Sequence, residues 1–293
     1  MRKRYTLQLP SGPLVLGERT LVMGIVNVTP DSFADGGLRL DPARAVGDAL
    51  AMVDAGADLV DVGAESTRPG APALGEDEEL ARLLPVVEGL AGRLRVPLSV
   101  DTYKARVADA ALARGAAIVN DISGLRFDPA LAGVVAARGA GLVLMHHRGR
   151  SADMYAHARY GDVAGEVAVE LAARVGDATA AGVPRDRLLV DPGLGFAKRA
   201  ADSYAALAGL DRLAALDLPI LVGPSRKSFI GEALGGVPPS ARGWGTAAAV
   251  AAAVLFGAHV VRVHDVAEMA DVVRVADRVR LAREARLSVP GPK

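Results

Sequence analysis

Three short apolar runs of this sequence end in a side chain that could recognise a flat polar ring. Asp101, Asn120 and Asp191 each close such a run and offer carboxylate or amide groups. A carboxylate accepts two parallel N–H bonds, which suits the amino-amidine edge of a heterocycle. If the fold gathers these residues, we expect them to form the floor of a site for such a ring.

Basic residues follow two later runs, GPSRKS from Gly223 to Ser228 and RVHD from Arg262 to Asp265. Together with nearby hydroxyl groups and a helix N-terminus, these cations favour an anion such as a phosphate or diphosphate. Lysine is rare in this chain, and its internal positions are Lys104, Lys198 and Lys227. Lys227 therefore indicates a place that needs a compact point charge rather than a planar guanidinium.

Two loops between apolar runs carry further candidates. The first, residues 27–37, spans about ten residues, which exceeds the usual βα connection of about two to six. We interpret it as a lid that folds over a substrate and carries Phe33. The second, residues 63–70, presents Arg68 beside a threonine hydroxyl, and a guanidinium suits phosphate oxygens.

The apolar runs themselves predict how these residues are brought together. Eight of them recur at intervals of about 20 to 45 residues, separated by Ala- and Leu-rich stretches with helical spacing. Strand then helix, repeated eight times, is the pattern of a (β/α)₈ TIM barrel, whose parallel strands are buried on both faces. In that fold the active site lies at the C-terminal ends of the strands. The strand ends therefore name as site candidates Asn27, Asp61, Asp101, Asn120, His146, Asp191, residues 225–227 and residues 262–264. The eight runs are TLVMGIVN, ADLVDVG, VPLSVD, AAIVND, GLVLMHH, RLLVD, LPILVG and AHVVRVHD.

The remaining segments complete one predicted domain over residues 1–293. Residues 5–17 read as a β-hairpin around Pro-Ser-Gly-Pro, which we expect to close the bottom of the barrel. The barrel occupies about residues 20–286, and residues 287–293 form a frayed tail. The chain is 51% apolar, which is enough for a large core.

Charge and cysteine content narrow the class of function. The formal net charge is zero, so nothing indicates a nucleic-acid-binding surface or a basic face directed at a membrane. Cysteine is absent, which excludes disulfides and thiolate chemistry and fits a reducing compartment. Polar residues interrupt the stretch after the basic start of the chain, so no signal peptide is predicted. We expect a cytoplasmic enzyme that acts on small molecules.

Seven motifs, in unbroken order over about residues 20–275, resemble those of the dihydropteroate synthase family. The resemblance implies a transferase that joins 6-hydroxymethyl-7,8-dihydropterin diphosphate to p-aminobenzoate and releases diphosphate, for folate synthesis. It also implies Mg²⁺ as the cofactor and a homodimer. The motifs are MGIVNVTPDSFADGG (23–37), DVGAESTRPGA (61–71), SVDTYK (99–104), NDISG (120–124), DPGLGFAK (191–198), SRKSFIG (225–231) and RVHDV (262–266).

By resemblance, each motif supplies residues to one part of the site. The pterin would be bound by Asp101, Asn120, Ile122, Met145, Asp191 and Lys227. The diphosphate would be bound by Asn27, Thr67, Arg68, Arg262 and His264, with Asn27 also meeting the Mg²⁺. The p-aminobenzoate pocket would consist of Phe33, Pro69, Phe196, Ser225 and Ser228. The residues expected to act in catalysis are Asp35, Arg68, Lys227, Arg262 and His264.

The chemistry of the implied substrates indicates a dissociative, SN1-like displacement. An electron-rich dihydropterin can stabilise positive charge at its exocyclic methylene, so diphosphate can leave before the arylamine attacks. Arylamines arrive unprotonated at neutral pH, so we assign no strong general base. Asp35 could take the proton after the attack.

Two other functions stay open from the sequence. A pterin-dependent corrinoid methyltransferase barrel shares the pterin floor but should lack the diphosphate-binding residues. A non-catalytic pterin-binding homologue would keep the fold without turnover. Three residues depart from the family pattern, His147, Ala197 and Arg199. Ala197 matters most, because a Cβ is unfavourable if that backbone needs a positive φ.

Overall fold

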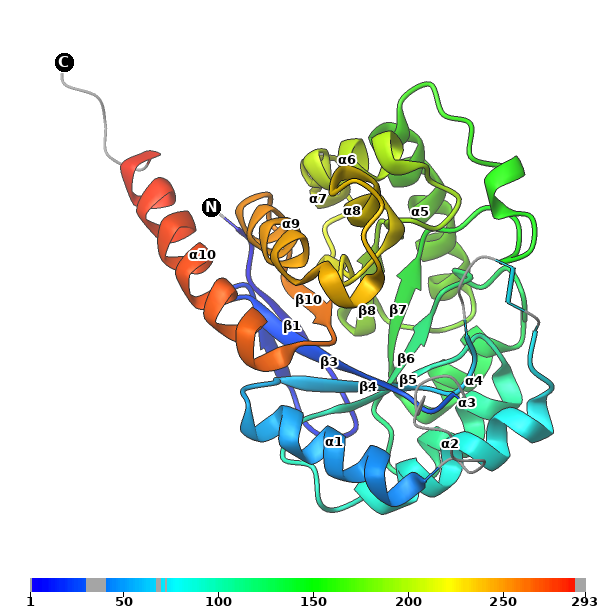
Figure 1. Ribbon diagram of the computed structural model, residues 1–293. Coiled ribbons are helices and arrows are strands. Elements are labelled where there is room, and N and C mark those ends of the chain that lie inside the picture. The colour runs from blue at the N-terminus through cyan, green and yellow to red at the C-terminus, as the bar shows by residue number, and fades with distance from the viewer. Residues whose placement is uncertain (1, 30–40, 67–69, 72, 288–293) are drawn as a thin grey trace.

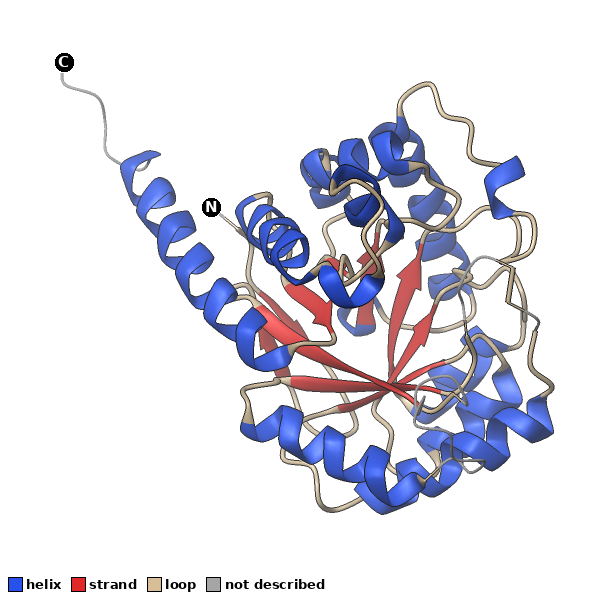
Figure 2. Cartoon of the chain, in the orientation of Figure 1, coloured by secondary structure: helices blue, strands red, loops and turns tan. Residues whose placement is uncertain are grey.

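Eight parallel strands form a barrel in the computed structural model, which describes residues 2–29, 41–66, 70–71 and 73–287. Their order is β8-β7-β6-β5-β4-β3-β10-β9, and a parallel bridge between Val190 and Ile220 joins the two ends. Helices surround the strands, so the predicted (β/α)₈ TIM barrel is confirmed (Figure 1, Figure 2). The strands are β3 (Leu21–Asn27), β4 (Leu59–Gly63), β5 (Leu98–Asp101), β6 (Ile118–Asp121), β7 (Gly141–Met145), β8 (Leu188–Asp191), β9 (Leu221–Val222) and β10 (Val260–Val263).

The helices follow the strands in the order that the sequence pattern predicts. The first begins as its sequence indicates, since Asp41 accepts a hydrogen bond from the Ala43 amide at 2.9 Å and Pro42 opens the helix. Within the described residues, no helix combines the length and the apolar character needed to cross a bilayer. The helices are α1 (Pro42–Asp54), α2 (Glu76–Leu90), α3 (Ala105–Leu112), α4 (Leu131–Arg138), α5 (Val163–Ala180), α6 (Ala200–Ala208), α7 (Leu210–Ala214), α8 (Ser228–Ala233), α9 (Gly243–Leu255) and α10 (Val266–Leu287).

Side chains along each strand alternate between two apolar clusters. Val60 and Val62 of β4 belong to the large cluster beneath the helices, whereas Leu59 belongs to a smaller cluster. Successive strand residues point to opposite faces, so the smaller cluster is the interior of the barrel. It contains Leu21, Met23, Leu59, Ile118, Val143, Leu189, Leu221 and Val260, all near the starts of their strands.

The N-terminal hairpin closes this interior from below, as the sequence predicts. β1 (Tyr5–Leu7) pairs antiparallel with β2 (Leu14–Leu16). Leu7, Leu9 and Leu16 are buried in the same cluster as the inward residues of the barrel strands. Removing such apolar side chains from water gives the hairpin its stability, because a free two-stranded ribbon is marginal.

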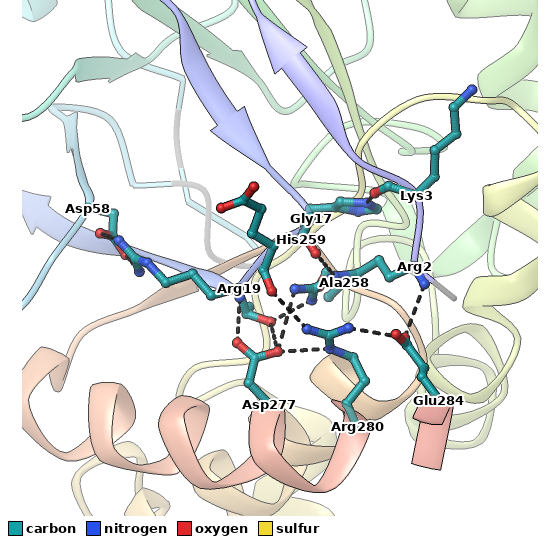
Figure 3. A network of polar contacts seen from close by, with 12 residues as sticks. Arg2, Lys3, Gly17, Arg19, Asp58, Ala258, His259, Asp277, Arg280 and Glu284 are labelled. Atoms are coloured by element: carbon teal, nitrogen blue, oxygen red, sulfur yellow. Dashed lines mark hydrogen bonds and ion pairs between the residues drawn. The ribbon is translucent and has the colours of Figure 1, made fainter. Parts of the chain in front are cut away.

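A polar network next to the hairpin ties the start of the chain to the last helix (Figure 3). The buried carboxylate of Asp277 in α10 accepts hydrogen bonds from Arg280 at 2.9 Å and from the Thr20 amide at 2.6 Å. Arg2 donates to the Thr20 hydroxyl at 2.6 Å and to the Ala258 carbonyl at 2.5 Å. These buried charges are paired and hydrogen-bonded, which is the condition for tolerating them in a core.

Thr20→Val should lower the free energy of unfolding by about 1 to 2 kcal/mol. The change keeps the shape of the side chain but removes its bonds to Arg2 and to Asp277 Oδ1, which lies 3.1 Å away. Urea denaturation with an unchanged m-value would measure the loss. Thr6→Val, at an exposed position of β1, is the matched control and should change stability by less than about 0.5 kcal/mol. Equal effects at the two positions would contradict a stabilising role for the network.

Candidate active site

A polar layer lies directly above the apolar interior of the barrel, at the C-terminal ends of the strands. Residues two apart in a strand point to the same face. In four of the strands, an apolar side chain in the barrel interior is therefore followed, two residues later, by a polar side chain on the same face. The polar residue therefore enters the mouth of the barrel from the same face that fills its core. The pairs are Leu59 and Asp61 in β4, Ile118 and Asn120 in β6, Leu189 and Asp191 in β8, and Val260 and Arg262 in β10.

Arg262 joins two carboxylates across the mouth of the barrel. Its Nε lies 2.6 Å from Asp61 Oδ2, and its Nη2 lies 2.7 Å from Asp101 Oδ2. The Asn120 amide donates to the same Asp61 oxygen at 2.9 Å. Charge-assisted bonds of this kind hold the arginine in one orientation. The structure thus brings three predicted residues, Asp101, Asn120 and Arg262, around one further carboxylate.

That carboxylate, Asp61, is one of the strand-end candidates, although the resemblance gives it no role. Its side chain is completely buried, and no partner of its Oδ1 lies among the described residues. Because Asp61 accepts from Nδ2 of Asn120, the Asn120 Oδ1 is left to face away from Asp61 as an acceptor. The signal in the sequence was the one charged residue inside the apolar run LVDVG. We assign Asp61 the positioning of Asn120 and Arg262.

Burial raises the pKa of Asp101 to about 7, against the opposing effect of Arg262. The ion pair at 2.7 Å favours the charged carboxylate, but a single arginine is shared with Asp61. The guanidinium charge shared with Asp61 offsets only part of the cost of burying Asp101, so the pKa of Asp101 stays raised. Asp101 is therefore partly protonated at neutral pH.

Binding of a ring through N–H donors to Asp101 should strengthen about tenfold between pH 6 and pH 8. The carboxylate accepts such bonds much more strongly than the carboxylic acid, and its population rises as pH passes through a pKa of about 7. Burial lowers the pKa of Lys227 to about 8, which sets the upper end of the useful range. Calorimetry with 6-hydroxymethylpterin at each pH would measure the change. Asp101→Asn should flatten the profile, and a flat profile in the unchanged chain would contradict the role of Asp101.

Asp191 and Lys227 form the opposite side of the mouth, around the loop that follows β8. The Gly193 amide donates to Asp191 Oδ1 at 2.7 Å, and Lys227 Nζ donates to the Leu194 carbonyl at 2.5 Å. Burial raises the pKa of Asp191, while the charge of Lys227 opposes that rise. Lys227 also lies over the ring of Phe196, 4.6 Å from its centroid. A carboxylate, an ammonium and an aromatic face thus meet at one loop.

The segments after β9 and β10 contact each other at the rim. The Ser225 hydroxyl lies 2.9 Å from His264 Nδ1 and accepts from the His264 amide at 3.2 Å. Arg226 forms an ion pair with Asp265, with Nε 3.2 Å from Oδ2. In this structure Ser225 therefore orients His264, and Arg226 is held by a carboxylate. The p-aminobenzoate role of Ser225 stays a prediction.

The other predicted residues divide into those that the structure places and those outside the described residues. Asn27 is exposed at the end of β3, and Ser228 is exposed at the start of α8. Ile122 and Met145 are buried beside the polar layer, after β6 and at the end of β7. The predictions that fall outside the described residues are Phe33, Asp35, Thr67, Arg68 and Pro69.

Ala197, one of the departures from the family pattern, has a positive φ. Its φ is +48°, in the left-handed region that disfavours a Cβ, and the residue is fully buried. The Tyr160 hydroxyl donates to the Ala197 carbonyl at 2.9 Å. The loop after β8 therefore contains a strained backbone position, at which Tyr160 holds the carbonyl.

Comparisons with known proteins identify the family of the chain. A family model described as pterin binding enzyme matches residues 23–264 of the chain. Dihydropteroate synthase of Mycobacterium leprae is 51% identical over 251 residues, which cover 84% of this chain and 88% of that protein.

Solved structures show the same likeness in three dimensions. Xanthomonas albilineans dihydropteroate synthase with 4-aminobenzoic acid has a TM-score of 0.88 at 44% identity, covering 98% of this chain and 100% of that chain. The Yersinia pestis dihydropteroate synthase in a sulfonamide drug complex has a TM-score of 0.88 at 42% identity. That match covers 94% of this chain and 99% of the other.

Proposed function

The chain belongs to the pterin-binding enzymes and, within them, to the dihydropteroate synthases, and from this premise we propose which residues carry its reaction. It is a transferase that condenses 6-hydroxymethyl-7,8-dihydropterin diphosphate with p-aminobenzoate to give 7,8-dihydropteroate and diphosphate. The observation that best supports the assignment of roles is the polar layer at the barrel mouth. It offers carboxylate and amide acceptors to the N–H-rich edge of a pterin.

Asp191 and Asn120 are the acceptors that we assign to the pterin ring, with Asp101 as a third. Their side chains are nearly buried and face the barrel axis, where hydrogen bonds are stronger than in water. Lys227 would donate to the ring from the other side, because its ammonium already lies at the loop after β8. Ile122 and Met145 supply the apolar contacts beside the ring.

We assign the diphosphate to the side of the mouth formed by β3 and β10. Nη1 of Arg262 has no partner among the described residues, so it could donate to a phosphate oxygen while Nε and Nη2 stay on Asp61 and Asp101. His264 follows two residues later, oriented by Ser225. Asn27 supplies an exposed amide on the neighbouring strand, and Thr67 and Arg68 are proposed to complete the group by resemblance.

Asn27 fits a Mg²⁺ ion that is bound mainly by the diphosphate. Mg²⁺ takes oxygen ligands and often keeps only one or two from the protein beside substrate phosphates and water. The exposed amide oxygen of Asn27 at the end of β3 is such a ligand. When bound, the ion would supply positive charge to the leaving group.

We propose that the bond from the pterin methylene to the diphosphate oxygen breaks before the new C–N bond forms. Arg262 and His264 would stabilise the negative charge that develops on the departing diphosphate. The acceptors Asp101 and Asp191 would stabilise the cationic pterin and hold its methylene toward the arylamine. The amine nitrogen then attacks with its lone pair and loses a proton, which Asp35 would accept.

Diphosphate release, measured with and without p-aminobenzoate, tests the assigned function. The chain should release diphosphate from the pterin substrate with Mg²⁺ present, and p-aminobenzoate should give stoichiometric dihydropteroate. A folded chain that binds 6-hydroxymethylpterin but releases no diphosphate would instead be the non-catalytic homologue. Transfer of a methyl group to a corrinoid would indicate the methyltransferase.

Sulfonamides should inhibit the chain competitively with p-aminobenzoate, and Phe33→Leu should weaken that inhibition selectively. A sulfonamide has the aminophenyl ring of the substrate but a larger substituent, which must pass the pocket rim assigned to Phe33 and Pro69. A contact made mainly with the larger ligand changes its affinity by about 1 to 3 kcal/mol more than that of the substrate. The inhibition constant should therefore rise more than the Michaelis constant for p-aminobenzoate.

Steady-state kinetics of both constants would settle the assignment of the rim. Pro69→Ala is a second variant, in the other of the two loops assigned to the rim, and should shift the constants in the same direction. Equal shifts in the two constants for Phe33→Leu would contradict the pocket, as would an unmodified chain that tolerates millimolar drug.

We further propose that the chain forms a homodimer through α9 and α10, which lie side by side (Figure 1). Trp244 in α9 is 90% exposed, and Val275 and Val279 in α10 are also exposed. Exposed apolar side chains on neighbouring helices are a feature of interfaces between protein chains. A cytoplasmic location, which fits the absence of cysteine, completes the proposal.

A further inference from the structure

Lys198 is a fully buried lysine to which the reaction described above gives no role. It is 1% exposed and is the largest of the fully buried side chains in the described part of the chain. Its Nζ lies 2.8 Å from His146 Nδ1, 3.1 Å from the Phe196 carbonyl and 3.2 Å from the Gly193 carbonyl. An ammonium has three N–H donors, and here each has one acceptor.

His146 can serve as the acceptor only if it is neutral and carries its proton on Nε2. That nitrogen lies 3.2 Å from Glu170 Oε2, which accepts the proton-bearing N–H and so selects this tautomer. Burial lowers the pKa of His146 to about 4, in agreement with a neutral ring. Glu170 is held in turn by Arg148, whose Nε lies 3.0 Å from Oε1. A chain of contacts thus runs from α5 to the loop after β8.

The ammonium form of Lys198 is the one that fits these partners. Burial lowers its pKa to about 7, and the charge of Asp191 opposes that effect. A neutral amine would have two donors for three acceptors, so one buried carbonyl or the imidazole nitrogen would lose its bond. An unpaired buried acceptor is costly, which favours keeping the proton in place.

Two lysines hold the loop of residues 193–196 from opposite sides. Lys227, at the mouth, donates to the Leu194 carbonyl. Lys198, which is fully buried, donates to the Gly193 and Phe196 carbonyls. The loop also packs tightly on the end of β7, because a Cβ at Gly193 would lie 2.1 Å from the His146 carbonyl. In this position of the loop, the Gly193 amide donates to Asp191 Oδ1. The position of the Asp191 carboxylate therefore depends on where Lys198 holds this loop.

We propose that Lys198, with His146 as its acceptor, is a positioning residue that sets the loop of residues 193–196 so that Asp191 and Phe196 face the pterin. The inference rests on the proposed function for the identity of its ligand. Lys198 touches neither substrate, since it is enclosed behind the loop. Its effect is on ground-state recognition of the pterin more than on the chemical step.

Lys198→Met keeps most of the length and the apolar character of the stem, and it removes all three donors. The dissociation constant of 6-hydroxymethylpterin should rise about 10- to 100-fold, because two buried carbonyls lose a charged donor and the loop shifts. In steady-state kinetics the Michaelis constant for the pterin diphosphate should rise similarly. The turnover number at saturation should fall by less than about threefold. A general loss of structure would lower the active fraction without moving the Michaelis constant.

Variants of His146 test the same contact from its other end. His146→Leu removes the acceptor and should weaken pterin binding in the same direction as Lys198→Met. His146→Asn keeps an oxygen near the place of Nδ1 and should recover most of the affinity. The double variant of Lys198→Met and His146→Leu should bind no more weakly than Lys198→Met alone, because both changes break one unit. Thr20→Val, at the far end of the barrel, is the control for lost stability and should leave pterin affinity unchanged.

A folded Lys198→Met chain that binds the pterin within twofold of the unchanged chain would overturn the inference. A His146→Asn chain that binds the pterin as weakly as the His146→Leu chain would also overturn it. If Lys198→Met does not fold, this comparison of the two His146 variants is the deciding test. If the unchanged chain binds no pterin, the proposed function fails, and the inference fails with it. If the unchanged chain binds the pterin and the variants bind it equally well, the inference fails but the proposed function stands.

Discussion

Arg262→Ala should lower the turnover number of the pterin diphosphate by about two to three orders of magnitude. Removing one preorganised donor to a developing negative charge costs about this much in enzymes that stabilise an anion. Arg262 would lose its contact with the diphosphate and also its bonds to Asp61 and Asp101. Quenched-flow measurement of diphosphate release, corrected for the folded fraction, would give the effect on the chemical step.

The correction for folding is needed because Asp61 is completely buried and would lose its counter-ion. Breaking a buried ion pair from one side costs about 3 to 5 kcal/mol of stability. The double variant of Arg262→Met and Asp61→Asn is the matched control, since it removes the charge of Arg262 together with that of Asp61, the fully buried one of its two partners. It should recover stability without recovering turnover.

Two ligands separate the roles of Arg262. Affinity for the pterin diphosphate should fall at least about a hundredfold, because the phosphate contact and the support of Asp101 are both lost. Affinity for 6-hydroxymethylpterin should fall about tenfold, through Asp101 alone. Equal losses for the two ligands would show that Arg262 acts on the pterin floor and does not bind the diphosphate.

Asp191→Asn should weaken pterin binding about 30- to 150-fold. The amide keeps one oxygen, which can still accept from the Gly193 amide at the position now 2.7 Å away. The second oxygen becomes an NH₂ group that faces the N–H donors of the pterin, so a charge-assisted pair is replaced by two opposed donors. The expected cost is about 2 to 3 kcal/mol. Calorimetry with 6-hydroxymethylpterin would measure it.

Asp41→Asn is the matched control for this substitution. Asp41 accepts a hydrogen bond from the Ala43 amide at the start of α1, and asparagine caps a helix about as well as aspartate. Pterin affinity and melting temperature should both stay unchanged. An Asp191→Asn chain whose affinity lies within threefold of the unchanged chain would refute the assignment of Asp191 to the pterin floor.

Much of the barrel could be predicted from hydrophobic patterning because parallel strands are buried on both faces. Every apolar run that indicated a barrel strand contains one, from β3 at Leu21–Asn27 to β10 at Val260–Val263. The run LPILVG forms only a two-residue strand, β9, because the Ile220 amide donates to the side chain of His259, at 3.1 Å from its Nδ1, and not to a neighbouring strand. Local pattern thus determined where strands occur, and neighbours along the sheet decided how long they are.

The candidate site was likewise predictable from the sequence only in part. Motifs and strand ends named Asp101, Asn120, Asp191, Lys227 and Arg262 as ligand-binding residues, since residue type and position along a strand are local properties. Nothing local showed that Arg262 would pair with Asp61, which lies 201 residues away. The spacing in the sequence also did not show that the Ser225 hydroxyl would contact His264.

The sequence by itself therefore determined the order of strands and helices, the inward face of each strand and the types of group at the barrel mouth. Only the tertiary structure decided which of these groups contact one another. The pairing of Asp61 with Arg262 and the enclosure of Lys198 beside His146 depend on the register of strands distant in sequence. The physical reason is that a buried charge takes its orientation from the partners that satisfy it, and closure of the barrel brings those partners within reach.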